Sequence, residues 1–152
     1  MIARQFGRKE ANKEYVPRPG AYAVIMDDRE RFVAVIHNGE FFLPGGGLQE
    51  NESQEAALKR EIIEETGFTA DIGEKIGEAN EYVYSPADDT YYNRLGTFYF
   101  ASTIGEPSHQ AKRDHEFRWV TLDEFSPGTE LTSHVWAVWR ALRRRQNKPV
   151  RG

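Results

Sequence analysis

The sequence predicts an α+β fold, arranged as an α/β/α sandwich around a mixed β-sheet. Strand-like apolar runs recur along most of the chain, whereas only two stretches have the length and composition of substantial helices. The chain has 152 residues, of which 39% are hydrophobic and 29% charged, so it is large and apolar enough for one packed domain. We expect no second full-size domain.

We expect one domain over residues 21–145, between an N-terminal arm (residues 1–20) and a basic C-terminal tail (residues 146–152). The arm is polar and ends in two prolines, which favour an edge or connecting segment. Six of the 20 basic residues follow position 139, where no acid occurs. The other 14 basic residues stand against 24 acidic ones. This balance is unfavourable for binding long nucleic acid.

The first strands are predicted close to the arm. Residues 21–26 and 31–37 are apolar runs around a polar turn, a pattern that predicts a hairpin. Asn38-Gly39 is a strong tight-turn dipeptide, so residues 40–43 are expected to form a short third strand. Pro44 and three glycines then end it in a loop.

A helix is predicted over residues 53–66. Ser53 is a suitable N-cap, Glu55 lies in the first turn and Gly67 ends the helix. Further elements are expected as strands at 68–76, 79–84, 94–101 and 116–120, and as a second helix at 131–145. The apolar stripe of this second helix, which includes Trp136 and Trp139, is expected to pack on the sheet.

Composition excludes several classes of protein. The chain has no cysteine, which rules out disulfide scaffolds, thiolate zinc sites and cysteine nucleophiles. No run of 18 apolar residues occurs, and the N-terminal residues lack the apolar stretch of a signal peptide. We therefore expect a cytoplasmic protein without a membrane partner.

Three glutamates are predicted to share one face of the helix over residues 53–66. Glu61, Glu64 and Glu65 are i, i+3 and i+4 neighbours, about 5–6 Å apart at Cβ. Each like-charged pair costs an isolated helix about 0.2–0.5 kcal/mol, so a cation is expected nearby. Oxygen ligands alone suit Mg²⁺ or Mn²⁺ better than zinc. A solvated helix face is the alternative.

The residues around these glutamates have a specific spacing. Gly46 is followed by five residues, Glu52, seven residues and then Arg60-Glu61-Ile62-Ile63-Glu64-Glu65-Thr66-Gly67-Phe68. This stretch resembles the signature box of the Nudix hydrolases at every specified position. The segments Phe-Leu-Pro-Gly-Gly at 42–46 and Arg-Trp-Val at 118–120 are also similar to that family. The resemblance implies the Nudix-type sandwich and the metal-dependent hydrolysis of a nucleoside diphosphate linked to another group.

The same resemblance implies roles for individual residues. The metal ligands that it implies for Mg²⁺ or Mn²⁺ are Glu61, Glu64, Glu65 and a carbonyl of Gly45 or Gly46. Glu61 is a ligand or the base for the attacking water, Arg60 orients the carboxylates and Glu52 supports them. The catalytic residues expected are Glu61, Glu65, Arg60 and, from outside the box, Glu116. For Glu116, an ordinary surface acid is the alternative.

The substrate is expected to be a small nucleotide. The candidate substrate contacts are Arg18, Tyr22, Phe42 and Tyr82. An aromatic ring can stack on a nucleobase, and an arginine can bind a phosphate. The first hypothesis is a house-cleaning hydrolase of nucleoside triphosphates or related nucleotides. The alternative is a non-catalytic module that senses or binds a nucleotide or nucleotide sugar. Either form is expected as a monomer or homodimer.

Overall fold

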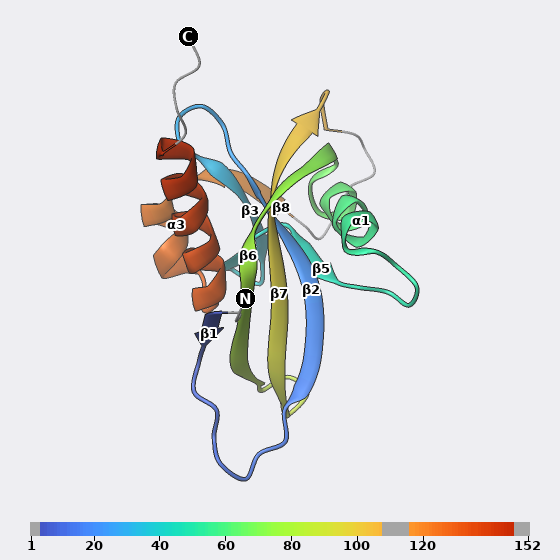
Figure 1. The fold of residues 1–152 in the computed structure, drawn as a ribbon, viewed down its shortest axis with the longest axis vertical. Helices are drawn as coiled ribbons and strands as arrows, with labels where there is room; N and C mark the ends of the chain where they lie inside the picture. Colours follow the sequence, from blue (N-terminus) through green and yellow to red (C-terminus); the bar gives the residue numbers. More distant parts are fainter. Residues whose placement is uncertain (1–3, 108–115, 148–152) are drawn as a thin grey trace.

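The computed structural model describes residues 4–107 and 116–147. Beyond residue 147, the predicted basic tail lies outside the described residues. Two β-sheets form the framework (Figure 1). The larger sheet has the strand order β1 (Arg4–Phe6), β6 (Thr69–Ser85), β7 (Thr90–Ile104), β2 (Val16–Ile25), β5 (Gly45–Gly47). The smaller sheet has the order β4 (Glu40–Phe42), β3 (Phe32–His37), β8 (Glu116–Val120).

The larger sheet is mixed, as predicted. Strands β1 and β6, and likewise β2 and β7, run parallel, whereas β6 with β7 and β2 with β5 run antiparallel. The smaller sheet is antiparallel throughout. The predicted α+β class is therefore confirmed.

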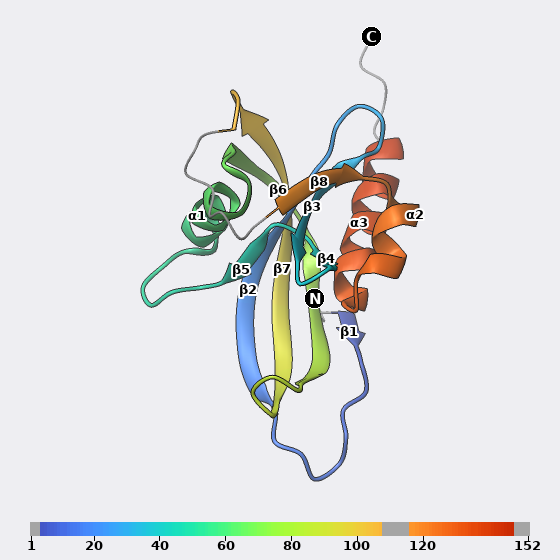
Figure 2. The same ribbon diagram turned by 180° about the vertical axis from the view of Figure 1, so that it is seen from behind.

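Helices lie on both sides of the larger sheet. Helix α1 (Gln54–Thr66) packs on one side and α3 (Thr132–Gln146) on the other, where α2 (Leu122–Phe125) and the 3₁₀ turn η1 (Ser126–Gly128) also lie (Figures 1 and 2). In α1, the Ser53 hydroxyl accepts a hydrogen bond from the Ala56 N–H at 3.1 Å, and Gly67 ends the helix at φ 79°. Both predicted caps are confirmed. In the part of the chain that the structure describes, no helix is long and apolar enough to cross a membrane.

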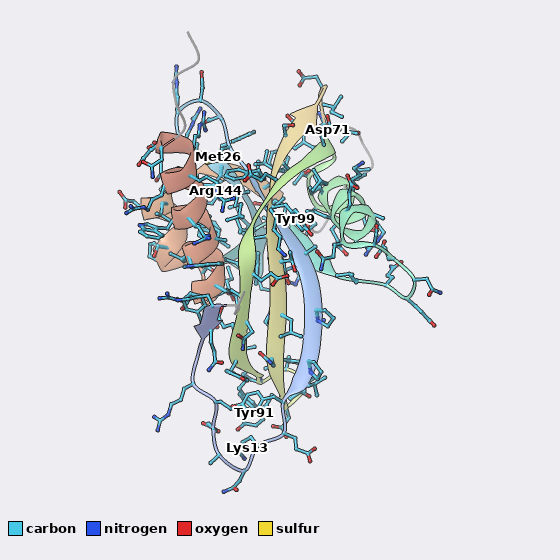
Figure 3. The ribbon with its side chains drawn as sticks, in the orientation of Figure 1. Lys13, Met26, Asp71, Tyr91, Tyr99 and Arg144 are labelled. Carbon is cyan, nitrogen blue, oxygen red and sulfur yellow. The ribbon has the colours of Figure 1, made fainter. Side chains whose placement is uncertain are left out.

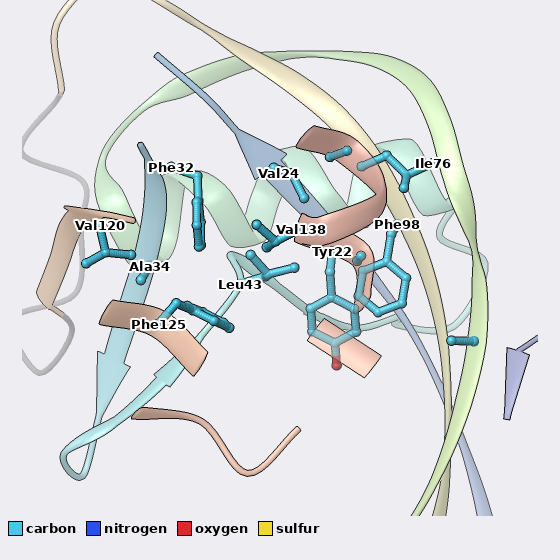
Figure 4. Close-up of a cluster of buried hydrophobic side chains, with 13 residues drawn as sticks. Tyr22, Val24, Phe32, Ala34, Leu43, Ile76, Phe98, Val120, Phe125 and Val138 are labelled. Atoms are coloured by element: carbon cyan, nitrogen blue, oxygen red, sulfur yellow. The ribbon is translucent and has the colours of Figure 1, made fainter. Parts of the chain in front are cut away.

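Strand β2 separates two apolar cores because its side chains alternate between the faces of the sheet. Ala21, Ala23 and Ile25 point toward α1, whereas Tyr22 and Val24 point toward α3. Figure 4 shows the second of these cores, in which the Tyr22 and Phe98 rings stack beside Leu43 and Val138. On the α1 side, Tyr99 (Figure 3) donates a hydrogen bond to Gln54, which joins β7 to the first residue of the helix.

The predicted hairpin of residues 21–26 and 31–37 is wrong. Strands β2 and β3 belong to different sheets and are linked by one isolated bridge, Met26 to Phe32. The reason is that β2 has partners on both edges: β7 pairs with it throughout, and β5 pairs with residues 20–22. Strand β3 turns away and pairs with β4 across the predicted Asn38-Gly39 turn.

Other elements also differ from expectation. The strand expected from residue 21 begins at Val16, inside the segment assigned to the arm. The two strands expected at 68–76 and 79–84 are one strand, β6, with register shifts between Ile72 and Gly77. The glycine segment expected as a loop pairs with β2 as strand β5.

The apolar stripe of α3 is only partly buried. Val138 is fully buried and Trp136 packs against the core, but the Trp139 side chain is 48% exposed. The Arg143 guanidinium lies 4.9 Å from the centroid of the Trp139 ring, so this tryptophan is on the outer surface of the helix.

Candidate active site

Arg60 is the centre of a cluster of charged side chains at α1. Its Nε and Nη2 atoms donate to the two carboxylate oxygens of Glu52 at 2.8 and 2.9 Å, a bidentate contact that ties the preceding loop to the helix. These hydrogen bonds from Arg60 lower the pKa of Glu52 to about 2 and raise the pKa of Arg60. Both groups are therefore charged at neutral pH.

The same guanidinium contacts the helix glutamates. Arg60 Nη1 donates to Glu61 Oε1 at 2.7 Å and lies 3.6 Å from Glu64 Oε2. Its Nη2 also donates to the carbonyl of Gly47 at 3.3 Å. One arginine thus offsets part of the repulsion among the glutamates and holds them beside the glycine strand.

Strand β5 brings backbone groups directly to the glutamates. The Gly45 N–H donates to Glu65 Oε1 at 2.8 Å. At Gly46, a Cβ atom would lie 3.0 Å from the Cδ of Glu61, so the absence of a side chain lets this carboxylate rest against the strand. Gly45 has φ 143°, and a Cβ there would lie 2.1 Å from the Ala21 carbonyl oxygen. Gly45 and Gly46 therefore admit close approach on both sides of β5.

The donor atoms of this cluster fit a hard divalent cation. Three glutamates, at 52, 61 and 64, contact Arg60, and Glu65 is held by the Gly45 N–H, which leaves an excess of negative charge at partly exposed oxygens. Over residues 4–107 and 116–147, no three Asp, Glu or His groups converge into a ready-made metal site. Glu61 is instead held by Arg60 and Glu65 by Gly45.

A cleft of about 180 Å³ opens beside these glutamates. Glu65, Gly45 and Gly46 border one part of it, and its apolar wall consists of Val35, Phe42 and Leu43. Tyr22, His37 and Arg94 contribute the other polar or aromatic groups. Two of the four predicted substrate contacts, Tyr22 and Phe42, therefore line the cleft.

Sequence reasoning missed two residues around this cleft. Arg94 Nη2 donates to the Tyr22 hydroxyl at 3.0 Å. Behind Tyr22, the ring of His134 lies 4.6 Å from the tyrosine ring, and its Nδ1 accepts from the Leu43 N–H at 3.1 Å. Burial, together with the charge of Arg94, lowers the pKa of His134 to about 3, so this imidazole is neutral. No local sequence signal marked either residue, because both act through contacts distant in the chain.

The other two substrate candidates do not line the cleft. Arg18 is exposed and places its guanidinium 5.0 Å from the Tyr92 ring centroid. Tyr82 packs edge-on against Tyr15, with ring centroids 4.9 Å apart, and Lys9 lies over its ring. These contacts belong to the end of the sheet near Tyr91 and Lys13 (Figure 3).

Among the described residues, no hydrogen bond or ion pair joins Glu116 to the glutamates of α1. It begins β8 and pairs with Ile36 of β3. The next residue, Phe117, pairs with Val35 and packs on Phe68 in the core beside α1. Since neighbouring residues of a strand point to opposite faces, the pairing register directs Glu116 away from α1. The parity of the strand, which sequence spacing does not reveal, accounts for this difference.

Comparisons with known proteins identify similar sequences. The family described as NUDIX domain matches residues 16–144. The "MutT-like protein" of Streptomyces ambofaciens is 27% identical over 117 residues, 76% of this chain and 69% of that protein. The "Putative 8-oxo-dGTP diphosphatase" of Bacillus subtilis (strain 168) is 37% identical over 60 residues, 38% of this chain and 40% of that protein. This match spans less than half the length of the Bacillus protein.

Solved structures share the fold. The MutT NUDIX hydrolase from Burkholderia pseudomallei superposes with a TM-score of 0.65 and 26% identity, covering 82% of this chain and 97% of that one. The NUDIX hydrolase from Nitrosomonas europaea gives a TM-score of 0.67 at 19% identity, covering 84% and 90% of the two chains.

Proposed function

The chain belongs to the NUDIX family, and on this premise we propose that it is a metal-dependent pyrophosphohydrolase of nucleoside diphosphates linked to another group. The observation that carries the proposal is that Glu61 and Glu65 contact the glycine strand, beside a cleft lined by apolar, aromatic and charged side chains. The substrate that we propose is a nucleoside triphosphate or related nucleotide, hydrolysed in a house-cleaning role. The name of the Bacillus relative, a putative 8-oxo-dGTP diphosphatase, supports this choice.

The residues that would hold Mg²⁺ or Mn²⁺ are Glu61, Glu64, Glu65 and a carbonyl of Gly45 or Gly46. When bound, the cation neutralises diphosphate oxygens and lowers the pKa of a coordinated water. Arg60 keeps the carboxylates in place through its hydrogen bonds to Glu52 and Glu61. The role of Glu61 is that of a ligand or of the group that accepts a proton from the attacking water.

The chain's own groups also position the substrate. The apolar wall at Phe42 and Leu43 excludes water from one side of the cleft. Holding the substrate in a fixed orientation beside the carboxylates lowers the entropy cost of reaching the transition state.

The test is the release of phosphate or pyrophosphate from a panel of nucleoside triphosphates, nucleotide sugars and dinucleoside polyphosphates with Mg²⁺ or Mn²⁺. Glu61→Gln and Glu65→Gln are each expected to lower turnover by at least about 10²-fold. Glu55→Gln is the matched control, because Glu55 lies on the same helix, is exposed and pairs only loosely with Lys59 at 3.6 Å.

Two outcomes would overturn the proposal. Near-parental rates in both Gln variants would remove the helix glutamates from the reaction. Metal-dependent binding of a nucleotide without hydrolysis of any panel member would instead support the alternative of a sensing or binding module.

A further inference from the structure

The cleft is lined by three chemically different groups. Glu65 supplies a carboxylate beside the glycine strand, next to the other proposed metal ligands. Arg94 supplies a cation to the same cleft, and the wall at Val35 and Phe42 is apolar. A volume of about 180 Å³ is smaller than that of sites for whole drug-sized ligands, so the cleft fits one part of a nucleotide.

The guanidinium of Arg94 is fixed by its surroundings. Its hydrogen bond to the Tyr22 hydroxyl depends on a tyrosine ring that is itself immobilised. The Tyr22 ring packs on His134 and Phe98 and lies over Gly20, where a Cβ would be 3.1 Å from the hydroxyl. A guanidinium held in this way loses little freedom when it binds a ligand.

The donors of Arg94 are not neutralised by the neighbouring acid. Glu81 pairs with Arg94 across β6 and β7, but it is 4% exposed and caps α3 instead. Its two oxygens accept the N–H groups of Thr132 and Ser133 at 3.0 and 2.9 Å. Within the described parts of the chain, Arg94 forms no ion pair, and its hydrogen bond to Tyr22 uses one of its five N–H groups.

We propose that Arg94 is the residue that selects the base of the substrate, by donating two N–H groups to two adjacent acceptors on a guanine. This inference rests on the proposed function of the same site. The O6 and N7 atoms of guanine form such an acceptor pair and match the fork of an arginine. Adenine has an amino group in place of O6, so a donor of the base would face a donor of the arginine.

A base fits this position better than a phosphate. The phosphates of a nucleotide belong at the proposed metal ligands, where a cation can offset the charge of Glu65 and its neighbours. The apolar wall that Val35 and Phe42 add to the cleft of Arg94 suits a flat ring, whereas a phosphate against that wall would lose its hydration. Phosphate binding by Arg94 is the outcome that the experiment must separate from base selection.

The experiment compares kcat/KM for GTP and ATP in the parent, in Arg94→Gln and in Arg29→Gln. The parent should favour GTP, and Arg94→Gln should shift the GTP/ATP ratio toward ATP by about 10- to 100-fold, because a glutamine amide pairs with adenine N6 and N7. Arg29 is the control, since it is an exposed arginine in the turn after Asp27, and its variant should keep the parental ratio.

A second variant covers a failure of Arg94→Gln to fold, which circular dichroism would detect. Tyr22→Phe keeps the ring packing and removes the hydroxyl that orients Arg94. It should lower the GTP/ATP ratio in the same direction by a smaller factor.

Oxidised guanine gives an independent readout. The N7 of 8-oxoguanine carries a proton, so its edge no longer offers two adjacent acceptors to an arginine. We therefore expect Arg94→Gln to lower kcat/KM for dGTP by a larger factor than kcat/KM for 8-oxo-dGTP. An equal loss for the two nucleotides would contradict base selection through O6 and N7.

The outcomes separate the two proposals. Equal loss of GTP and ATP hydrolysis in Arg94→Gln would show a base-independent contact with phosphate and overturn base selection alone. A parent enzyme that cleaves GTP and ATP at equal kcat/KM would also overturn base selection. Failure of the parent to cleave any nucleotide overturns the proposed function.

Discussion

Replacing Gly46 by alanine separates the demands of catalysis from those of stability. The new Cβ would lie 3.0 Å from the Glu61 Cδ and 3.2 Å from each carboxylate oxygen, whereas ordinary contacts begin at 3.4 Å. Glu61 must therefore move by a few tenths of an ångström or more. Such a shift strains the 2.7 Å hydrogen bond from Arg60. Gly46 has no positive φ, so the backbone accepts alanine without strain.

The expected loss is one of activity. A misplacement of about 1 Å in a catalytic group can cost about 10²-fold, so the smaller shift in Gly46→Ala should lower kcat by about 10-fold. Its melting temperature should remain close to that of the parent, because the group that moves is the end of a flexible side chain. Nucleotide hydrolysis with Mg²⁺ and thermal melting of the same preparations measure the two effects.

The neighbouring glycines are matched controls for this prediction. At Gly47 the nearest atom to a new Cβ is the Pro19 carbonyl oxygen at 3.8 Å, so Gly47→Ala should keep both activity and stability. At Gly45 the contact with Ala21 is 2.1 Å and φ is 143°, so Gly45→Ala should lose more than about 1 kcal/mol of stability. Normal activity in Gly46→Ala would refute the argument, as would a loss of stability equal to that of Gly45→Ala.

Three further predictions concern stability. Glu81→Gln keeps only one acceptor oxygen for the N–H groups at the start of α3, so urea denaturation should show a loss of about 1.5–3 kcal/mol; an unchanged midpoint would contradict this. The lowered pKa of Glu52 stabilises the fold fully above its ordinary value of 4.5, and this contribution disappears as pH falls toward about 2. Melting curves between pH 2 and 6 should therefore be less pH-dependent in Glu52→Gln than in the parent, and equal slopes would count against the Arg60 contact as the cause. A chain ending at Leu142 loses Arg144, which donates to the Lys75 and Ile76 carbonyls at 2.7 and 3.2 Å, and should melt lower than a chain ending at Asn147. Equal melting temperatures would mean that these contacts add nothing.

The features that sequence predicted well are those set by local chemistry. Ser53 and Gly67 delimit α1 through contacts within a few residues, and the strand at 116–120 has the predicted bounds. The Asn38-Gly39 turn likewise joins β3 to β4 as expected, with φ values of 50° and 78°. Each of these features depends on the conformational preferences of residues that are neighbours in the sequence.

The features that sequence did not predict depend on long-range pairing. Residues 21–26 and 31–37 have the pattern of a hairpin, but the preference for it is overridden because β7 and β5 occupy the edges of β2. The position of Glu116 in the sequence was compatible with a role in the site. In β8, however, its side chain is one residue out of phase with those that face α1. Arg94 and His134 reach the cleft through Tyr22 and Leu43, contacts that span 72 and 91 positions of sequence.

The glutamate cluster itself shows how local cost and long-range compensation combine. Spacing alone predicted repulsion among Glu61, Glu64 and Glu65, and the structure answers it with one arginine and one backbone N–H. Arg60 is shared with Glu52, so its positive charge is insufficient for the whole cluster. Because the described carboxylates do not converge on one point, and Glu61 and Glu65 are held by Arg60 and Gly45, a cation would have to draw these side chains together. The hydrogen bonds from Arg60 and from the Gly45 N–H offset part of the repulsion among the three glutamates, and the metal ion that we propose would offset the remainder.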